Sequence, residues 1–178
     1  MESYQNILYK KRAVESLSTI ISQTEAKKIL FLASKTAYQN FGALVTNQLA
    51  LADCEFVLKL LPSQCTKQNV QDAISCAKDC VLVVALGGAS ICDIAKIVAT
   101  TLDLDFILIP SMPSNFGYFT LDSFCQEENV YKKIRTNQAY KILVDENIIS
   151  MDKNLFCHFM KHCFLVSLTI CFTTTKGI

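Results

Sequence analysis

The sequence predicts an α/β fold, a Rossmann-like parallel sheet flanked by helices, and three observations support this prediction. Apolar runs and amphipathic stretches alternate along residues 5–113, and the connections between them are short. The apolar runs are continuous, which is typical of strands that are covered on both faces. The repeated order of strand, helix and strand favours right-handed crossovers within one parallel sheet.

Six strands are expected in this sheet, and the first is a short, partly apolar edge strand. The strands cover residues 5–11, 27–34, 55–62, 80–88, 105–113 and 140–144. Four helices are expected between them, because apolar residues recur there at helical spacing. The helices cover residues 13–23, 36–51, 66–79 and 89–103. After Pro113 the alternation stops, and a long loop follows that could contain a hairpin.

Composition argues against several classes of function. The 178 residues allow one domain, or one domain and a fragment. A net charge of +1 provides no general attraction to nucleic acid or to a membrane surface. The N-terminus lacks the apolar segment of a signal peptide. Nine cysteines without a C-x-x-C pair indicate reduced thiols packed inside a cytoplasmic protein rather than a disulfide framework.

The tail, residues 151–178, is apolar, β-branched and aromatic and has no clear period. Its uncharged stretch, residues 163–175, is too short to cross a bilayer as a helix. The tail is either an edge element packed on the sheet or an incomplete piece of something larger.

Two histidines in the tail are weak candidates for a metal site. His158 and His162 are four residues apart, so on a helix both could face one metal ion, with Cys157 and Cys163 beside them. No other nearby cluster completes a ligand set. Two ordinary histidines in a packed or frayed tail are therefore the better interpretation.

A glycine pair marks the end of the third long apolar run. Gly87 and Gly88 follow this run and precede an amphipathic helix. Ligands of open parallel sheets bind at the carboxyl ends of the strands, where glycine lets a phosphate approach the backbone and a helix N-terminus offers N–H groups. Ser90 could add a hydroxyl. The glycines could equally just turn the chain, with Ser90 and Asp93 at the spacing of a capping box.

Residues 87–96, GGASICDIAK, are similar to the G-G-G-S-x-x-D-x-A-K signature of the iron-containing alcohol dehydrogenase superfamily. This superfamily includes glycerol dehydrogenase and glycerol-1-phosphate dehydrogenase. Four further segments resemble it in the same order: its opening strand and helix, first nucleotide-binding strand, second signature and closing strand. They are residues 7–21, 29–42, 106–120 and 139–150.

The resemblance implies a dinucleotide-binding α/β domain over residues 1–150, with NAD or NADP as cofactor and partner. The residues that it places along the cofactor are Gly87, Gly88, Ala89, Ser90, Asp93, Ser111, Ser114, Thr120 and Lys35. The first four would lie against the pyrophosphate. Apart from the resemblance, Ser111 and Ser114 could belong to a proline-flanked turn, and Lys96 could pair with Asp93 on a solvated face.

Three positions depart from the family pattern. Ala89 replaces the third glycine, which slightly hinders approach to the backbone there. Ser34 and Lys35 replace the acid that would favour NAD over NADP, so the choice of cofactor stays open. Phe116 replaces an aspartate of catalytic members, which weakens the case for substrate binding.

The resemblance also implies a helical second domain that supplies an aspartate and histidines to a divalent metal, zinc or iron. Those ligands are not found in residues 151–178, which would be a remnant or replacement of that domain. We therefore expect the cofactor half of an NAD(P)-dependent oxidoreductase for a polyol or glycerol phosphate, inactive alone and homodimeric through its edge strand. Two alternatives stay open: a non-catalytic nucleotide-binding or dimerising module, and a relative of dehydroquinate synthase.

Two other side-chain groups could in principle act as a nucleophile or as an acid/base pair. Cys92 lies in the first turn of the glycine helix, where the helix dipole could lower the pKa of its thiol, although a packed thiol is the better interpretation. Glu127 and Glu128 are predicted to be solvated charges of the long loop rather than an acid/base pair.

Overall fold

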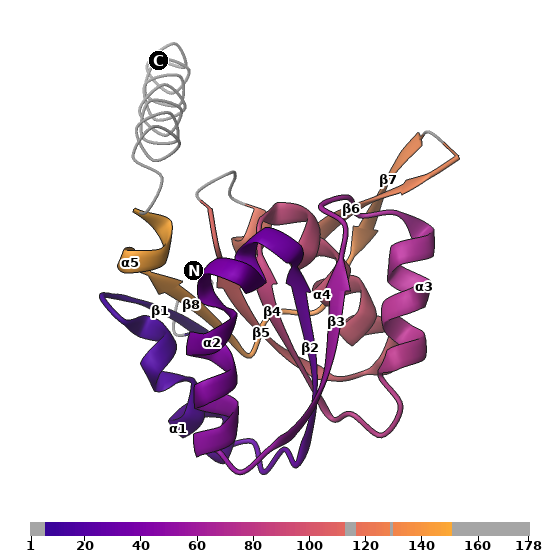
Figure 1. Ribbon diagram of the computed structural model, residues 1–178. Coiled ribbons are helices and arrows are strands. Elements are labelled where there is room, and N and C mark those ends of the chain that lie inside the picture. Colours follow the sequence, from indigo (N-terminus) through magenta and orange to yellow (C-terminus); the bar gives the residue numbers. More distant parts are fainter. Residues whose placement is uncertain (1–5, 113–116, 129, 151–178) are drawn as a thin grey trace, which may run out of the picture.

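The protein is built on a six-stranded parallel sheet with helices on both faces (Figure 1). The structure is a computed structural model that describes residues 6–112, 117–128 and 130–150. The strand order is β1-β8-β5-β4-β2-β3, and every pairing is parallel. The strands are β1 (Ile7–Lys10), β2 (Lys28–Ser34), β3 (Glu55–Leu61), β4 (Leu82–Gly87), β5 (Asp105–Pro110) and β8 (Lys141–Asp145). The predicted fold class is confirmed.

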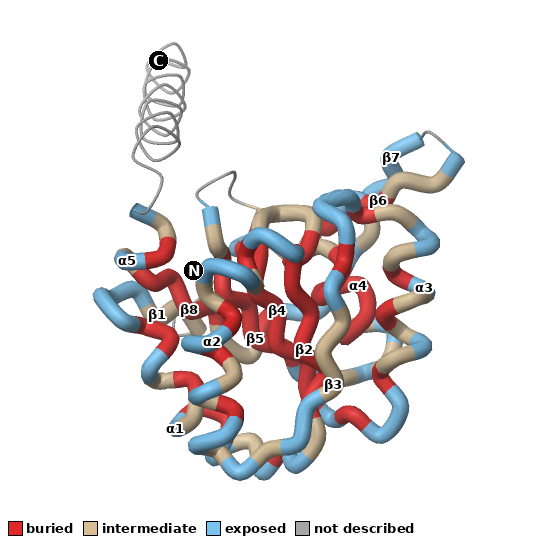
Figure 2. Tube along the Cα trace, viewed as in Figure 1, coloured by how far each residue is buried: buried red, intermediate tan, exposed pale blue. Residues whose placement is uncertain are grey.

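Two apolar cores lie on the two faces of the sheet. One face packs against α3 (Lys67–Cys76) and α4 (Ala89–Leu102). The other packs against the 3-10 helix η2 (Ala13–Ser16), α1 (Leu17–Ser22) and α2 (Lys35–Leu51). Figure 2 shows the buried strands between these helix layers. Among the described residues, no helix is both long enough and apolar enough to cross a membrane.

Most expected element boundaries lie within a few residues of the observed ones. The expected helix over residues 13–23 is divided into η2 and α1. α2 begins at Lys35 because the Ser34 hydroxyl accepts a hydrogen bond from the backbone N–H of Ala37 at 3.2 Å and caps the helix. The expectation that every strand is covered on both faces is wrong for β3, which is only partly buried because it forms an edge of the sheet.

The expected hairpin is present after β5. It consists of β6 (Asp122–Glu127) and β7 (Val130–Arg135), which pair antiparallel. A short 3-10 helix, η3 (Gly117–Phe119), precedes it. β6 packs against α4 and is joined to the start of α3 by a bridge between Thr66 and Gln126. The hairpin therefore projects beside the end of the sheet where the parallel strands finish (Figure 1).

A buried aspartate joins the N-terminal segment to the end of β8. The Asp145 carboxylate accepts hydrogen bonds from the backbone N–H groups of Arg12, Val14 and Asn147 at 3.0–3.1 Å. The Asn147 bond caps the one-turn helix α5 (Glu146–Ile149). The edge strand β1 is thus held in place by side-chain as well as main-chain bonds.

Candidate functional site

The glycine turn lies at the carboxyl edge of the sheet, between two adjacent strands. Gly87 is the last residue of β4 and lies opposite Pro110 of β5. The backbone N–H of Ser111 donates to the carbonyl of Gly87 at 2.9 Å. Residues 87–90 and Ser111, which are distant in sequence, are therefore brought together at the place where ligands of open α/β sheets bind.

The two glycines of this turn differ in whether the surrounding structure leaves room for a side chain. A Cβ on Gly87 would lie 2.7 Å from the Cβ and Cγ1 atoms of Ile91, so the close packing of α4 on β4 requires glycine there. A Cβ on Gly88 would meet only the flexible side chain of Met112, at 3.2 Å from its Sδ. Gly88 has φ −75° and ψ −173°, which any residue can adopt. Neither backbone conformation nor helix packing therefore requires glycine at position 88.

The helix α4 begins without a side-chain cap. Gly88 is its N-cap residue, and the N–H groups of Ile91 and Cys92 donate to the Gly88 carbonyl at 3.1 and 3.2 Å. The alternative interpretation of Ser90 and Asp93 as a capping box is therefore wrong. The first N–H groups of a helix have no carbonyl of their own helix to bond, so the half-buried start of α4 can offer them to an anion.

Met112 lies over Gly88 and partly covers the turn. Its side chain is 38% exposed and is the nearest group to the position of a Gly88 Cβ. Methionine is unbranched and flexible, so it can move without disturbing the sheet. A ligand on the main chain of Gly88 would have to displace or slide along this side chain.

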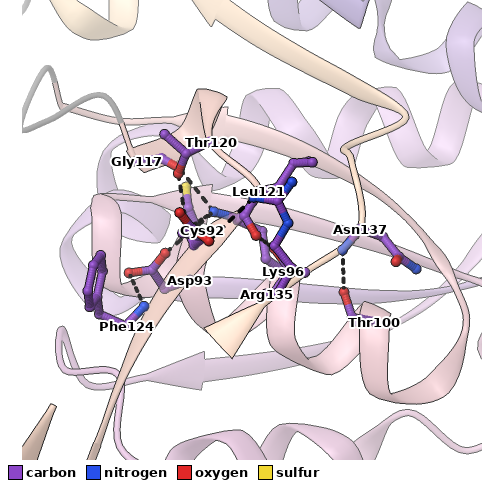
Figure 3. Close-up of polar contacts among 12 residues, drawn as sticks. Cys92, Asp93, Lys96, Thr100, Gly117, Thr120, Leu121, Phe124, Arg135 and Asn137 are labelled. Atoms are coloured by element: carbon purple, nitrogen blue, oxygen red, sulfur yellow. Dashed lines mark hydrogen bonds and ion pairs between the residues drawn. The ribbon is translucent and has the colours of Figure 1, made fainter. Parts of the chain in front are cut away.

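Lys96 is fully buried, which corrects the expectation that it pairs with Asp93 on a solvated face. Its side chain is 1% exposed, and its Nζ donates to the carbonyl oxygens of Gly117 at 3.0 Å and Asp122 at 2.6 Å (Figure 3). Asp93 Oδ1 lies 3.8 Å from the same Nζ. Burial lowers the pKa of Lys96, and the Asp93 carboxylate opposes this effect. The lysine binds η3 and the start of β6 to α4.

Asp93 connects α4 to the hairpin. Its Oδ2 accepts a hydrogen bond of 3.5 Å from the backbone N–H of Phe124 in β6 (Figure 3). Burial raises the pKa of Asp93, while Lys96 and the Phe124 N–H act in the opposite direction. The buried Ser123 hydroxyl lies close enough to lower this pKa as well, although it makes no hydrogen bond of normal geometry. The carboxylate is 16% exposed, so one side of it still faces solvent.

The other predicted cofactor residues are more dispersed. Lys35 is exposed at the first turn of α2, beyond β2. The Thr120 hydroxyl is within 3.1 Å of the carbonyl oxygens of both Gly117 and Asp122, so it can bond within its own loop. Ser114 lies outside the described residues, as do Phe116, His158 and His162. Within the described residues, no group of three or more His, Cys, Asp or Glu side chains could hold a metal ion.

Neither Cys92 nor Glu127 has the surroundings of an activated nucleophile or an acid/base group. Cys92 is 1% exposed, which confirms the interpretation as a packed thiol, and burial raises the pKa of the thiol to about 12. Glu127 is the last residue of β6 rather than a loop residue, and it forms solvent-exposed ion pairs with Lys132 and Lys67. Its hydrogen bond to Lys132, followed by that to Lys67, lowers the pKa of Glu127 to about 2.

Sequence reasoning missed the burial of Lys96 and the position of Met112. A local signal existed for Lys96, because Cys92 and Ala99 lie on the same side of the helix and are apolar and buried. No local signal places Met112, since its contact with Gly88 depends on the pairing of β4 with β5.

Comparison with known proteins gives a consistent result. The family model for iron-containing alcohol dehydrogenase matches residues 8–151. The glycerol-1-phosphate dehydrogenase (NAD(P)+) of Methanocorpusculum labreanum is 26% identical over 124 residues, which cover 68% of this chain and 34% of that protein. The chain thus spans about a third of the length of this curated relative.

Solved structures share the fold at low sequence identity. The NADH-dependent butanol dehydrogenase A of Thermotoga maritima superposes with a TM-score of 0.79 at 15% identity, over 88% of this chain and 46% of that one. A probable glycerol dehydrogenase from Sinorhizobium meliloti superposes with a TM-score of 0.73 at 15% identity, over 83% of this chain and 41% of that one.

Proposed function

The chain belongs to the iron-containing alcohol dehydrogenase family, and we propose that residues 1–150 form a nicotinamide dinucleotide-binding domain. The enzyme type is an NAD(P)-dependent oxidoreductase for a polyol or glycerol phosphate. The name of the relative from Methanocorpusculum labreanum supports glycerol 1-phosphate within this class. A bound nicotinamide supplies or accepts a hydride.

The observation that carries this proposal is the accessible glycine at position 88, the N-cap residue of α4. Gly87 is accounted for by the contact with Ile91, but Gly88 has neither a restrictive φ nor a rigid neighbour. An absent Cβ that internal structure does not require is what close approach of a phosphate to the backbone would need. In this proposal the pyrophosphate lies along Gly88, Ala89 and Ser90.

The remaining residues border the path of the cofactor in our proposal. Ser111 is next to Gly87 at the end of β5. Asp93 of α4 accepts a hydrogen bond from the hairpin, and the Thr120 hydroxyl bonds within the loop that precedes the hairpin. Their polar atoms would form the rim of the cofactor site. Lys35 would lie beside the adenosine ribose in this proposal, where no acid is present to favour NAD and the ammonium could donate to the 2′-phosphate of NADP, so either cofactor stays open. Ser114 is retained from the family pattern alone.

Metal binding and substrate turnover are not assigned to the described residues, because they hold no cluster of metal ligands. We therefore propose that residues 1–150 alone bind cofactor without turning over substrate. Residues 151–178 stay assigned to a separate tail by sequence only. A homodimer through β1, which is at one edge of the sheet, and a cytoplasmic location also stay predictions.

Substituting Gly88 by alanine tests the proposal. Titration with NADH and NADPH should give an affinity at least about tenfold weaker for Gly88→Ala, since about 1.4 kcal/mol is lost when a methyl group displaces the pyrophosphate. The free energy of unfolding in urea should fall by no more than about 1 kcal/mol, because Met112 has to move and alanine is a poorer N-cap residue than glycine.

The double variant Gly88→Ala/Met112→Ala is the matched control. If the new methyl group excludes the cofactor directly, affinity stays low when Met112 is shortened. If the methyl group acts by pushing Met112 into the site, affinity recovers. Recovery, or binding by Gly88→Ala equal to that of the unsubstituted protein, would contradict the proposed pyrophosphate position. Absence of any binding of either coenzyme to the unsubstituted protein would reject the function.

A further inference from the structure

Two buried cysteines that are distant in the sequence are neighbours at the base of the β6–β7 hairpin. Cys65 lies in the connection between β3 and α3, and Cys125 lies in β6. The backbone N–H of Gln126 donates to the carbonyl of Cys65 at 2.8 Å, and Thr66 and Gln126 form a parallel bridge. The two cysteines each precede a member of this bridge, so they are paired across the two segments.

The thiols point into the same apolar core. Cys65 is 7% exposed and Cys125 is 6% exposed, and both belong to the core cluster under α3 and α4. Burial raises the pKa of the Cys65 thiol most, and the neighbouring Cys125 thiol raises it further. An influence of one thiol on the other is expected only when they are close together.

The pairing of the two segments predicts a backbone spacing that a disulfide can span. Paired residues of neighbouring strands lie about 4.8 Å apart. Disulfide-linked residues have Cα atoms roughly 4.4–6.8 Å apart. Paired residues of parallel segments also project to the same side, so a bond between Cys65 and Cys125 requires little movement of the main chain.

From this geometry we propose that Cys65 and Cys125 form a reversible oxidation site, whose oxidant is hydrogen peroxide. One thiolate attacks a peroxide oxygen, so that an S–O bond forms, the O–O bond breaks and hydroxide leaves. The second thiol attacks the sulfenic sulfur, so that an S–S bond forms, the S–O bond breaks and the oxygen leaves as water. The thiols lose two electrons and two protons in total, and one peroxide becomes two water molecules.

Solvent reaches the immediate surroundings of this pair. An open hollow of about 440 Å³ is lined by residues that follow the two cysteines directly, including Thr66, Lys67, Gln126 and Glu127. Both thiols are buried and neither lines the hollow, so the reaction is slow and depends on local openings of the chain that expose them.

The bond would fasten the hairpin to the start of α3. Cys125 is adjacent to Phe124, whose N–H is bonded to Asp93. Oxidation would therefore fix the position of β6 against α4 at the rim of the candidate cofactor site. The oxidation site itself does not depend on the proposed cofactor, so failure of one proposal leaves the other testable.

Tryptic mapping of the full chain tests the proposal, because each thiol has its own peptide. Peptide 60–67, LLPSQCTK, contains Cys65 alone, and peptide 97–132 contains Cys125 alone. The reduced, folded protein is treated with hydrogen peroxide, alkylated and digested. We expect peptides 60–67 and 97–132 to be linked, with the loss of two titratable thiols per chain and their return after dithiothreitol.

Variants separate this pair from the other thiols. Cys65→Ser and Cys125→Ser should each abolish the linked peptide. Cys54→Ser is the matched control and should leave the link unchanged, because Cys54 packs on the opposite face of the sheet. The unsubstituted protein decides the question even if a variant fails to fold.

Two results would overturn the proposal. One is recovery of both peptides as separate alkylated or over-oxidised species from folded, peroxide-treated protein. The other is an equal yield of the link in concentrated urea, since this would mean that the folded geometry does not bring the thiols together.

Discussion

Replacing Lys96 by methionine is expected to destabilise the protein strongly, although methionine fills a similar volume. The lysine ammonium is buried and donates to the carbonyl oxygens of Gly117 and Asp122. It is also the nearest cation to the Asp93 carboxylate, at 3.8 Å. The substitution keeps the apolar contacts of the stem and removes these polar contacts, so its effect measures the polar contribution.

The magnitude follows from which groups lose their partner. The Gly117 carbonyl also accepts from the backbone N–H of Thr120 at 3.4 Å, and the Thr120 hydroxyl lies within 3.1 Å of both carbonyls, so each carbonyl keeps a neutral donor within reach. The loss is therefore that of the charged donor, which costs about 1.5–3 kcal/mol. The largely buried Asp93 carboxylate loses its cation and adds to this cost. Together we expect a loss of about 3 kcal/mol, or roughly a hundred-fold in the folding equilibrium.

Urea unfolding followed by circular dichroism measures this loss. The double variant Asp93→Asn/Lys96→Met should recover about 1 kcal/mol, because it removes the carboxylate that the single variant leaves without a cation. A loss below about 0.5 kcal/mol for Lys96→Met would refute the reasoning. No recovery in the double variant would show that the carboxylate is not the source of the penalty.

Two further predictions concern buried carboxylates. Burial raises the pKa of Asp93, so the folded state binds this proton more tightly than the unfolded chain, and stability should fall as pH rises from 3.8 through the raised value. Urea midpoints across this range should show the fall in the unsubstituted protein but not in Asp93→Asn, and parallel curves would contradict the assignment. Asp145→Ala removes three hydrogen bonds from backbone N–H groups and should cost about 3–5 kcal/mol in urea unfolding, whereas a cost below about 1 kcal/mol would show that water replaces the carboxylate.

Local pattern was sufficient for the main elements of the fold. The continuous apolar run of β4 indicates a strand that is covered on both faces. The apolar residues of α4 recur at helical spacing, which indicates a helix with one buried stripe. The same logic misjudged β3, whose apolar residues lie at an exposed edge. Apolar composition alone does not report which position in the sheet a strand occupies.

The candidate site was predicted less completely. The glycine turn was located because strand end and helix start are adjacent in sequence. Gly87 and Gly88 nevertheless look alike in the sequence, and only the contact between Gly87 and Ile91 separates a packing glycine from an accessible one. Ser90 and Asp93 do not form a capping box, because the N-cap residue of α4 is Gly88. The residue at which a helix starts depends on how the helix packs.

By itself, the sequence determined the parallel α/β architecture and the place of the glycine turn, because periodicity and composition are properties of neighbouring residues. The tertiary structure alone decided that Lys96 is enclosed by the loop of residues 117–122, that Met112 covers Gly88 and that Cys65 meets Cys125. Each of these contacts joins segments that strand order and crossover direction bring together. Burial and charge at such points depend on long-range packing, which no local window of residues contains.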